Sequence, residues 1–428
     1  MSNLEVAAGR LWDSRAIIDD FRTLCALGGR FAGTPSEIQA REFLAARLAE
    51  LVGAQVRREP IPYRGWDRGD ARLTLPGGRS FAVCALVRSP STPPGGLRAP
   101  VLDLGRGTPA DFALAAERIP GHIVLVRHEY MLAAGHIHRR RKYELAMAAG
   151  AVGFLIACHL PGGLVVTGSS GAGASEDMPA AGISYEAAAE IAEMPEADIT
   201  LEVAGSFVDR VAENLFVDIP GKTNEWVVLS AHLDGHHLAA SAIDNGSGIV
   251  SVLAAASVLK DIVARGRRGL RVALYNIEEW ALLGSRDHLA ALPESERRSL
   301  VFNVNLDSVA GASRLAALTS GIPIAERLVG TVNDAHGMGI RLHRPFMGNS
   351  DHANFIRAGI PALRLCCGMD DPGSNLRFLL TAGDTSDKVS PLELKAAAIA
   401  AVALVLAAMD VDIPRLSGED ISRITAAI

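Results

Sequence analysis

Acidic and histidine side chains occur in four short groups, each at the end of a segment predicted to be a buried strand. The groups are His232-x-Asp234, Asp244-Asn245, Glu278-Glu279 and Asp307. Imidazole nitrogens and carboxylate oxygens are ligands that divalent transition metals accept. Because the carboxyl ends of parallel strands share one edge of a sheet, the four groups are predicted to meet there. Each group alone is explained by a helix cap or a first-turn acid, but together they indicate a metal site.

The charges of these groups also favour a bound cation. Several carboxylates gathered at one buried edge would repel each other, and burial would raise their pKa values. A divalent cation removes this cost. Of the adjacent pair Glu278 and Glu279, one can bind the metal while the other takes a proton from an activated water molecule. The sequence therefore predicts hydrolysis by metal-activated water.

Strands and helices alternate after residue 210. Strands are predicted at 213–219, 226–231, 270–277, 300–306, 315–319 and 362–365, with helices at 246–264, 279–292, 322–336, 351–358 and 392–409. Five of the six residues in 226–231 are apolar, which is typical of a parallel strand covered on both faces. The alternation predicts an α/β fold with a mainly parallel mixed sheet covered by helices.

The region before residue 210 has a different pattern of predicted helices and strands. Helices at 14–27 and from Pro35 to residue 51, the latter capped by Thr34, precede an edge strand at 55–61. Short strands and Gly-rich links between residues 101 and 204 predict a smaller inserted β/α module. We therefore predict an N-terminal part of the catalytic domain at 1–95, an inserted domain at 96–207, and the main catalytic domain at 208–428.

Bulk properties narrow the class of protein. The 428 residues carry a net charge of −6, and the basic run Arg139-Arg140-Arg141-Lys142 is predicted to be a solvated helix face, so we expect no nucleic-acid partner. Five cysteines without a Cys-x-x-Cys motif favour neither a disulfide framework nor a thiolate zinc site. The N-terminal residues lack a secretory pattern, and no apolar run reaches the ~18 residues of a membrane span. We expect a cytoplasmic enzyme that acts on a small-molecule substrate, either as a monomer or as a homo-oligomer.

The motifs around the acidic groups resemble the M28 family of zinc aminopeptidases and carboxypeptidases. The matching segments are Ala231-His-Leu-Asp-Gly, Ile243-Asp-Asn-Gly-Ser-Gly, Ile277-Glu-Glu-Trp-Ala-Leu-Leu-Gly-Ser, Asn305-Leu-Asp-Ser and Asn349-Ser-Asp-His-Ala-Asn-Phe. The inserted module resembles a protease-associated (PA) domain through Gly121-His-Ile-Val-Leu-Val, Ala148-Ala-Gly-Ala-Val-Gly-Phe and Met178-Pro-Ala-Ala-Gly-Ile-Ser. The resemblance implies a zinc-peptidase-like fold with a PA-like insertion.

The resemblance also implies a role for each acidic residue. His232, Asp244 and Asp307 would hold one metal, and Asp234 would orient His232. Asp244 would bridge to a second metal held by Glu279, with Glu278 as the general base. The family's remaining ligand is a histidine in a His-Thr-x-x-Asp-Thr box, and this chain has Leu380-Thr-Ala-Gly-Asp-Thr there.

Leu380 cannot bind a metal, so the second site is incomplete. Replacement ligands could come from His236, His237 or His352. Three outcomes follow: one metal, two metals with a substituted ligand, or none. We favour one metal per chain, either zinc or manganese.

A missing second metal favours a substrate other than ordinary peptides. The leading expectation is a hydrolase of a small amide or aromatic amine, similar to nitroanthranilate deaminases. The alternatives are a two-metal aminopeptidase or dipeptidase, and an inactive binding or scaffold protein. If the substrate carries a carboxylate, an arginine should bind it in a bidentate manner. Arg364 is the first choice, followed by Arg377 and Arg344.

Overall fold

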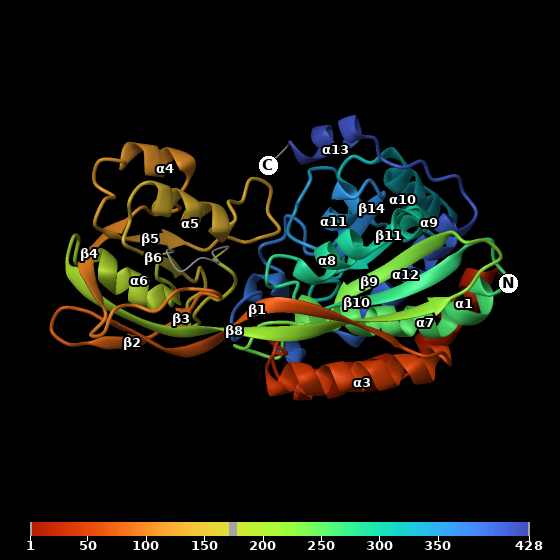
Figure 1. The fold of residues 1–428 in the computed structure, drawn as a ribbon, viewed down its shortest axis with the longest axis horizontal. Helices are drawn as coiled ribbons and strands as arrows, with labels where there is room; N and C mark the ends of the chain where they lie inside the picture. The colour runs from red at the N-terminus through yellow and green to blue at the C-terminus, as the bar shows by residue number, and fades with distance from the viewer. Residues whose placement is uncertain (1, 171–177, 427–428) are drawn as a thin grey trace.

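The computed structural model describes residues 2–170 and 178–426, and these form two lobes joined by one mixed sheet (Figure 1). The described strands pair into 14 members in the order β13-β12-β14-β11-β9-β10-β8-β4-β5-β6-β7-β3, with β1 on β8 and β2 on β1. Their bounds are β1 (Arg57–Thr74), β2 (Ser80–Ala82), β3 (Cys84–Ala85), β4 (Leu97–Asp103), β5 (Ile123–Arg127), β6 (Gly153–Ala157), β7 (Ala180–Ile183), β8 (Asp198–Ile219), β9 (Trp226–His232), β10 (Gly269–Tyr275), β11 (Leu300–Leu306), β12 (Leu315–Leu318), β13 (Arg341–His343) and β14 (Ala362–Cys367).

Helices cover both faces of the sheet in the larger lobe. One face contacts α7 (Gly248–Val263) and α12 (Pro391–Met409), and α8 (Leu283–Ala291) and α11 (His352–Arg357) pack against each other by β11 and β14 (Figure 1). The remaining helices are α1 (Asn3–Asp13), α2 (Ala16–Ala26), α3 (Pro35–Val52), α4 (Pro109–Leu114), α5 (Arg139–Ala148), α6 (Tyr185–Ala192), α9 (Glu294–Ser299), α10 (Pro323–His336) and α13 (Gly418–Thr425), with a π-helix at Ala242–Ser247 directly before α7 and one-turn helices at Asn375–Phe378 and Ser386–Lys388. The α/β architecture with a mainly parallel mixed sheet and an inserted domain is confirmed.

Local sequence explains the central elements. All seven residues of β10 are buried, because helices cover both faces of this strand. Helix α3 begins as predicted, since the Thr34 side chain accepts a hydrogen bond from the Glu37 N–H and Pro35 is the first helical residue. In α12, Ser390 and Glu393 form a capping box ahead of an almost wholly apolar helix.

The connection between the lobes differs from the predicted one. The strand expected at 55–61 lengthens into the 18 residues of β1, and the strand expected at 213–219 is only the last part of β8. These strands pair antiparallel from Arg57 with Phe216 to Thr74 with Thr200. Because much of this ribbon is exposed, its residues lack the apolar pattern that identifies buried strands. The predicted domain boundary at 207/208 therefore falls inside β8 rather than in a linker.

Helix α8 begins four residues later than predicted. Residues Ala281 and Leu282 adopt positive φ values of 74° and 63°, so the chain turns between Glu279 and Leu283 before it becomes helical. This turn places the two glutamates at the end of β10 instead of on the helix.

Two helical segments are long and apolar enough to cross a membrane by length and composition, namely Ala242–Val263 and Pro391–Met409. Their most apolar stretches are 78% and 61% buried inside the fold, and a core helix has the same composition. The sequence expectation had counted only uninterrupted apolar runs and found neither segment.

Candidate metal centre

The parallel register of three strands brings the predicted ligands to one edge of the sheet. In the pairing of β9 with β10, His232 lies opposite Tyr275, three residues before Glu278. In the pairing of β9 with β11, Ser230 lies opposite Asn305, which brings the next residues, up to Asp307, level with His232. Sheet register thus produces the convergence expected from the sequence.

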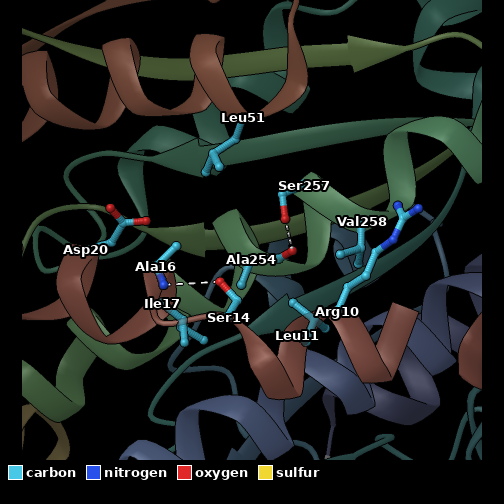
Figure 2. Close-up of a pocket in the computed structure, with 10 residues that line it drawn as sticks. All are labelled: Arg10, Leu11, Ser14, Ala16, Ile17, Asp20, Leu51, Ala254, Ser257 and Val258. Atoms are coloured by element: carbon cyan, nitrogen blue, oxygen red, sulfur yellow. Dashed lines mark hydrogen bonds between the residues drawn. The ribbon is translucent and has the colours of Figure 1, made fainter. Parts of the chain in front are cut away.

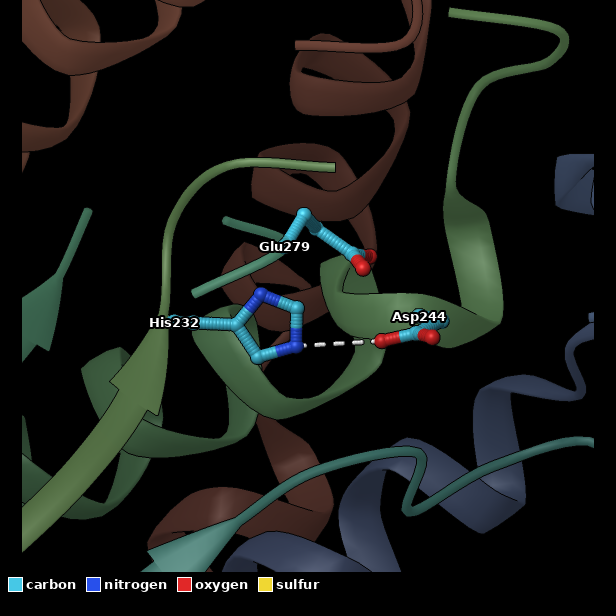
Figure 3. A group of neighbouring side chains, drawn as sticks. All are labelled: His232, Asp244 and Glu279. Carbon is cyan, nitrogen blue, oxygen red and sulfur yellow. Dashed lines mark hydrogen bonds and ion pairs between the residues drawn. The ribbon is translucent and has the colours of Figure 1, made fainter. Parts of the chain in front are cut away.

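His232 stands at the centre of this group. Its Nε2 atom lies 3.0 Å from Oδ1 of Asp244 and 3.8 Å from Oδ1 of Asp307. Figure 3 shows the imidazole directed at Asp244, with the Glu279 carboxylate beside both. Ligand atoms of His232, Asp244 and Glu279 lie within 4.8 Å of one another, and so do those of His232, Glu278 and Asp307. The carboxylate and imidazole donors suit a divalent cation such as zinc.

Asp234 holds two parts of the centre in place. His232 Nδ1 lies 3.2 Å from the backbone carbonyl of Asp234 and 3.7 Å from its carboxylate, which directs Nε2 toward the site. The same carboxylate accepts hydrogen bonds from the backbone N–H groups of Glu278 and Glu279, at 3.0 and 3.2 Å. Asp234 therefore positions the glutamate pair as well as the histidine, a role that the sequence analysis did not assign.

The glutamate pair is buried in a dense field of negative charge. Burial raises the pKa of Glu278 well above its ordinary value, the His232 charge opposes this, and the carboxylate of Glu279 adds to it. Burial also raises the pKa of Glu279, and Asp244 raises it further. A divalent cation would supply the positive charge that this cluster lacks. The unfavourable charge density is therefore an observation that fits a metal site.

His236 faces the second half of the centre. Its Nε2 lies 2.6 Å from Oε1 of Glu279, and both side chains are buried. The contact lacks hydrogen-bond geometry, so Glu279 Oε1 and both ring nitrogens of His236 have no hydrogen-bond partner within the described ranges. Buried polar atoms of this kind normally have a partner, and a cation or a substrate amine would provide one.

Leu380 occupies the position where the resemblance expects a histidine ligand. Its side chain is buried in the hydrophobic core of the inserted domain, with Leu102, Phe112 and Phe154 among that cluster. Its backbone carbonyl accepts a hydrogen bond from Thr167 N–H at 2.8 Å. The segment that would carry the ligand is instead used to attach the inserted domain.

Three other residues proposed for ligand or substrate binding lie elsewhere. The ring of His237 packs edge-on against Phe31, at 4.9 Å between centroids. His352 is fully buried on α11, where burial lowers its pKa to about 3 and the charge of Arg364 acts in the same direction. Arg377 donates to the Gly373 carbonyl at 2.6 Å and lies over the Phe378 ring. These contacts place all three outside the two clusters of ligand atoms.

Arg364 does not have the free guanidinium that was expected of a carboxylate receptor. Its Nη2 lies 3.1 Å from Oδ1 of Asp307, and its Nε donates to the Asp307 backbone carbonyl at 3.3 Å. Burial would raise the pKa of Asp307, but the Arg364 charge holds it below its ordinary value. Because Asp307 directly follows β11 and Arg364 lies on the neighbouring strand β14, Arg364 fixes the carboxylate. Arg344 pairs with Glu326 on the exposed surface.

Asp384 is a positioning residue that the sequence analysis did not identify. Its two carboxylate oxygens accept hydrogen bonds from the backbone N–H groups of Ile243, at 2.7 Å, and Asp244, at 3.2 Å. Asp384 is the acidic residue of segment 380–385, which matches the family's His-Thr-x-x-Asp-Thr box. The sequence therefore contained a signal for this residue. Asp384 fixes the backbone that carries the Asp244 ligand.

Replacing Asp384 with alanine is expected to weaken metal binding by about 10- to 100-fold, because the backbone N–H groups of Ile243 and Asp244 each lose their acceptor. Competition with a chelator measures the change. Asp387→Ala removes an exposed carboxylate three residues later and serves as the control. Equal metal affinity in both variants would contradict this role.

The basic run 139–142 is not the solvated helix face that the sequence predicted. Arg139 and Lys142 are buried, and Lys142 donates to the Glu129 carboxylate at 2.9 Å. Arg141 remains exposed and pairs with Glu144. Because a helix turns by about 100° per residue, consecutive basic residues face different directions. Composition alone could not tell which of them turn inward.

A cavity of 260 Å³ lies away from this edge, between the N-terminal helices and the later part of α7 (Figure 2). Leu11, Ile17 and Val258 contribute apolar walls. Asp20 is the single carboxylate among the labelled residues, and Arg47 pairs with it at 2.9 Å. The lining offers no cluster of metal ligands.

Comparisons with known proteins agree with this fold. Residues 214–405 match the model of peptidase family M28, and residues 87–191 match that of the PA domain. Aminopeptidase YwaD of Bacillus subtilis is 27% identical over 390 residues, which are 87% of this chain and 79% of that protein. The structure of BSAP, a zinc aminopeptidase from Bacillus subtilis, superposes with a TM-score of 0.74 at 25% identity, covering 92% of this chain and 94% of its own. The structure of a peptidase M28 precursor from Shewanella amazonensis SB2B superposes with a TM-score of 0.80 at 25% identity, covering 97% of this chain and 99% of its own.

Proposed function

Since the chain belongs to peptidase family M28 and is a metal-dependent hydrolase of C–N bonds, we propose that it is an aminopeptidase that removes the N-terminal residue of short peptides. The support is the aminopeptidase activity that the names of YwaD and BSAP state, at coverage that includes both lobes. The sequence analysis had favoured a small amide or aromatic amine because of Leu380. Nothing among these relatives supports that preference, and its aminopeptidase alternative is the better supported one.

The adjacent carboxylates of Glu278 and Glu279 beside His232 are the observation that carries this proposal. An aminopeptidase needs one group that transfers protons and one that binds the substrate ammonium. Glu279 Oε1 is buried, and its contact with His236 Nε2 at 2.6 Å lacks hydrogen-bond geometry, so the oxygen accepts no hydrogen bond in the described part of the chain. A substrate ammonium offers three donors, so it would satisfy this carboxylate.

The proposed mechanism assigns one task to each side chain. A divalent ion held by His232, Asp244 and Asp307 would polarise the scissile carbonyl and lower the pKa of water. Glu278 accepts a proton from the attacking water and delivers it to the leaving nitrogen, as its raised basicity allows. Glu279 holds the ammonium, and Asp234 keeps both glutamates in register with His232.

The free amine provides the direct test of this function. The dipeptide Ala-Ala should be hydrolysed, whereas N-acetyl-Ala-Ala, which lacks the ammonium, should be turned over at least about 10²-fold more slowly because Glu279 loses its ligand. Release of alanine from each compound is the measurement. Equal rates, or hydrolysis restricted to blocked amides or aromatic amines, would contradict an aminopeptidase.

We further propose one zinc ion per chain, because Leu380 removes a ligand from the second site. Elemental analysis of the purified protein is expected to give one equivalent of metal. Two equivalents would contradict this count, and a drop from two to one in His236→Ala would then identify His236 as the substitute ligand, given its 2.6 Å contact with Glu279.

A further inference from the structure

Arg30 is a fully buried cation that donates its hydrogen bonds to backbone carbonyls. It lies in the segment between α2 and α3. Its Nε donates to the Leu233 carbonyl at 3.2 Å, Nη1 to the Ala240 carbonyl at 2.6 Å, and Nη2 to the Ser241 carbonyl at 2.8 Å. A longer contact joins Nη1 to the Gly28 carbonyl at 3.4 Å. Burial of a charged group is costly unless it is hydrogen-bonded, and these carbonyls meet that requirement.

Three of these carbonyls stand at the two ends of the loop between two predicted metal ligands. Leu233 directly follows His232, and Ser241 lies three residues before Asp244. The planar guanidinium spans both ends, because Nε binds the start of the loop whereas Nη1 and Nη2 bind its end. Arg30 therefore joins the backbone beside one ligand to the backbone near the other.

The backbone around Arg30 also contacts this loop. The Arg30 carbonyl accepts a hydrogen bond from the Gly235 N–H at 3.1 Å. A Cβ atom at Gly29 would lie 1.8 Å from the His236 carbonyl oxygen and 2.7 Å from that of Ala239, so only glycine fits against the loop here. Residues 29 and 30 thus hold the loop 233–241 through backbone packing as well as through the guanidinium.

The same loop carries His236. Ser241 Oγ accepts a hydrogen bond from the His236 N–H at 2.8 Å and donates to the His236 carbonyl at 3.3 Å. Because Arg30 Nη2 holds the Ser241 carbonyl, Ser241 links Arg30 to His236. His236 Nε2 in turn lies 2.6 Å from Oε1 of Glu279. A shift of this loop would therefore disturb both clusters of ligand atoms.

We propose that Arg30 is a positioning residue of the metal centre, which sets the separation of His232 and Asp244 by joining the ends of the loop between them. Asp384 holds the backbone N–H groups of Ile243 and Asp244, whereas Arg30 holds carbonyls of the residues just before them. The inference rests on the proposed metal centre, but it does not depend on which substrate the enzyme hydrolyses.

Arg30→Met and Arg30→Lys test whether the guanidinium fork positions the ligands. Methionine removes every donor, whereas lysine keeps the positive charge but gathers its donors on one atom. Both variants are expected to bind a divalent metal about 10- to 100-fold more weakly than the wild type, as measured by competition with a chelator. Wild-type affinity in folded Arg30→Met would overturn the proposal. Wild-type affinity in Arg30→Lys would overturn it too, because charge alone would then suffice.

Arg268 provides a matched control for a general loss of stability. It is also buried, and it donates to the backbone carbonyls of Ala408 at 2.7 Å and Val411 at 2.6 Å and pairs with Glu225. It directly precedes β10, at the opposite end of that strand from the metal centre. Arg268→Lys should lower the midpoint of thermal unfolding and leave the metal affinity unchanged. Equal weakening of metal binding in Arg30→Lys and Arg268→Lys would overturn the proposal.

Gly29→Ala tests the loop while Arg30 stays in place. The added methyl group must displace the His236 carbonyl, so metal binding should weaken here as well. Gly9→Ala, on α1 where a Cβ atom meets open space, is the control. If Arg30→Met does not fold, Arg30→Lys and Gly29→Ala decide the question. A wild type that binds no divalent metal would refute the metal centre together with this inference, whereas equal affinity in the wild type and these variants would refute this inference alone.

Discussion

Glu278→Gln is expected to lower kcat by at least ~10²-fold while the divalent metal stays bound. Glutamine keeps the volume and the backbone of Glu278, whose N–H is held by Asp234 at 3.0 Å. It cannot accept a proton, so water is no longer activated by this side chain. Steady-state rates with Ala-Ala and elemental analysis of the same preparation measure the two quantities.

The control for this change is Glu296→Gln, because Glu296 is an exposed residue of α9. Its rate should equal that of the wild type. Activity retained in Glu278→Gln would remove this residue as the base. Loss of metal from Glu278→Gln would instead make it a ligand, an arrangement that its clustering with His232 and Asp307 also permits.

Asp307→Ala is expected to remove both the metal and the activity. The carboxylate lies 3.8 Å from Nε2 of His232 and is held by Ser350 and Arg364. Its loss leaves His232 and Asp244 as the remaining ligands of the predicted trio. Metal content and the hydrolysis rate, measured on one sample, should fall together.

The alanine variant also leaves the buried Arg364 without its partner, which is expected to lower the free energy of unfolding by about 3–5 kcal/mol. Asp307→Asn keeps the volume and one oxygen, so it tests metal binding with less disturbance. Asp334→Asn, on the exposed side of α10, is the matched control. Unchanged metal content in folded Asp307→Asn and Asp307→Ala would refute the assignment of Asp307 as a ligand.

The second half of the centre has Leu380 where the resemblance to the family predicts a histidine ligand. Leu380 packs in the core of the inserted domain, and Nε2 of His236 lies 2.6 Å from the Glu279 carboxylate.

Local sequence predicted the elements whose burial pattern is regular. Strand β9 and the start of α3 were identified because an apolar run and a capped proline are local signals. The β1–β8 ribbon was not, because it is stabilised by pairing between residues more than a hundred positions apart, and its faces are partly exposed. Such pairing leaves little trace in the composition of either strand.

The sequence by itself determined the α/β fold and the convergence of His232, Asp244 and Asp307, since strand ends in a parallel sheet must share an edge. Only the tertiary structure decided which positively charged side chain pairs with which carboxylate. Arg364 became the partner of Asp307 because strand β14 lies beside strand β11. Direction and distance control electrostatic interaction, and neither can be read from a charged residue's place in the chain.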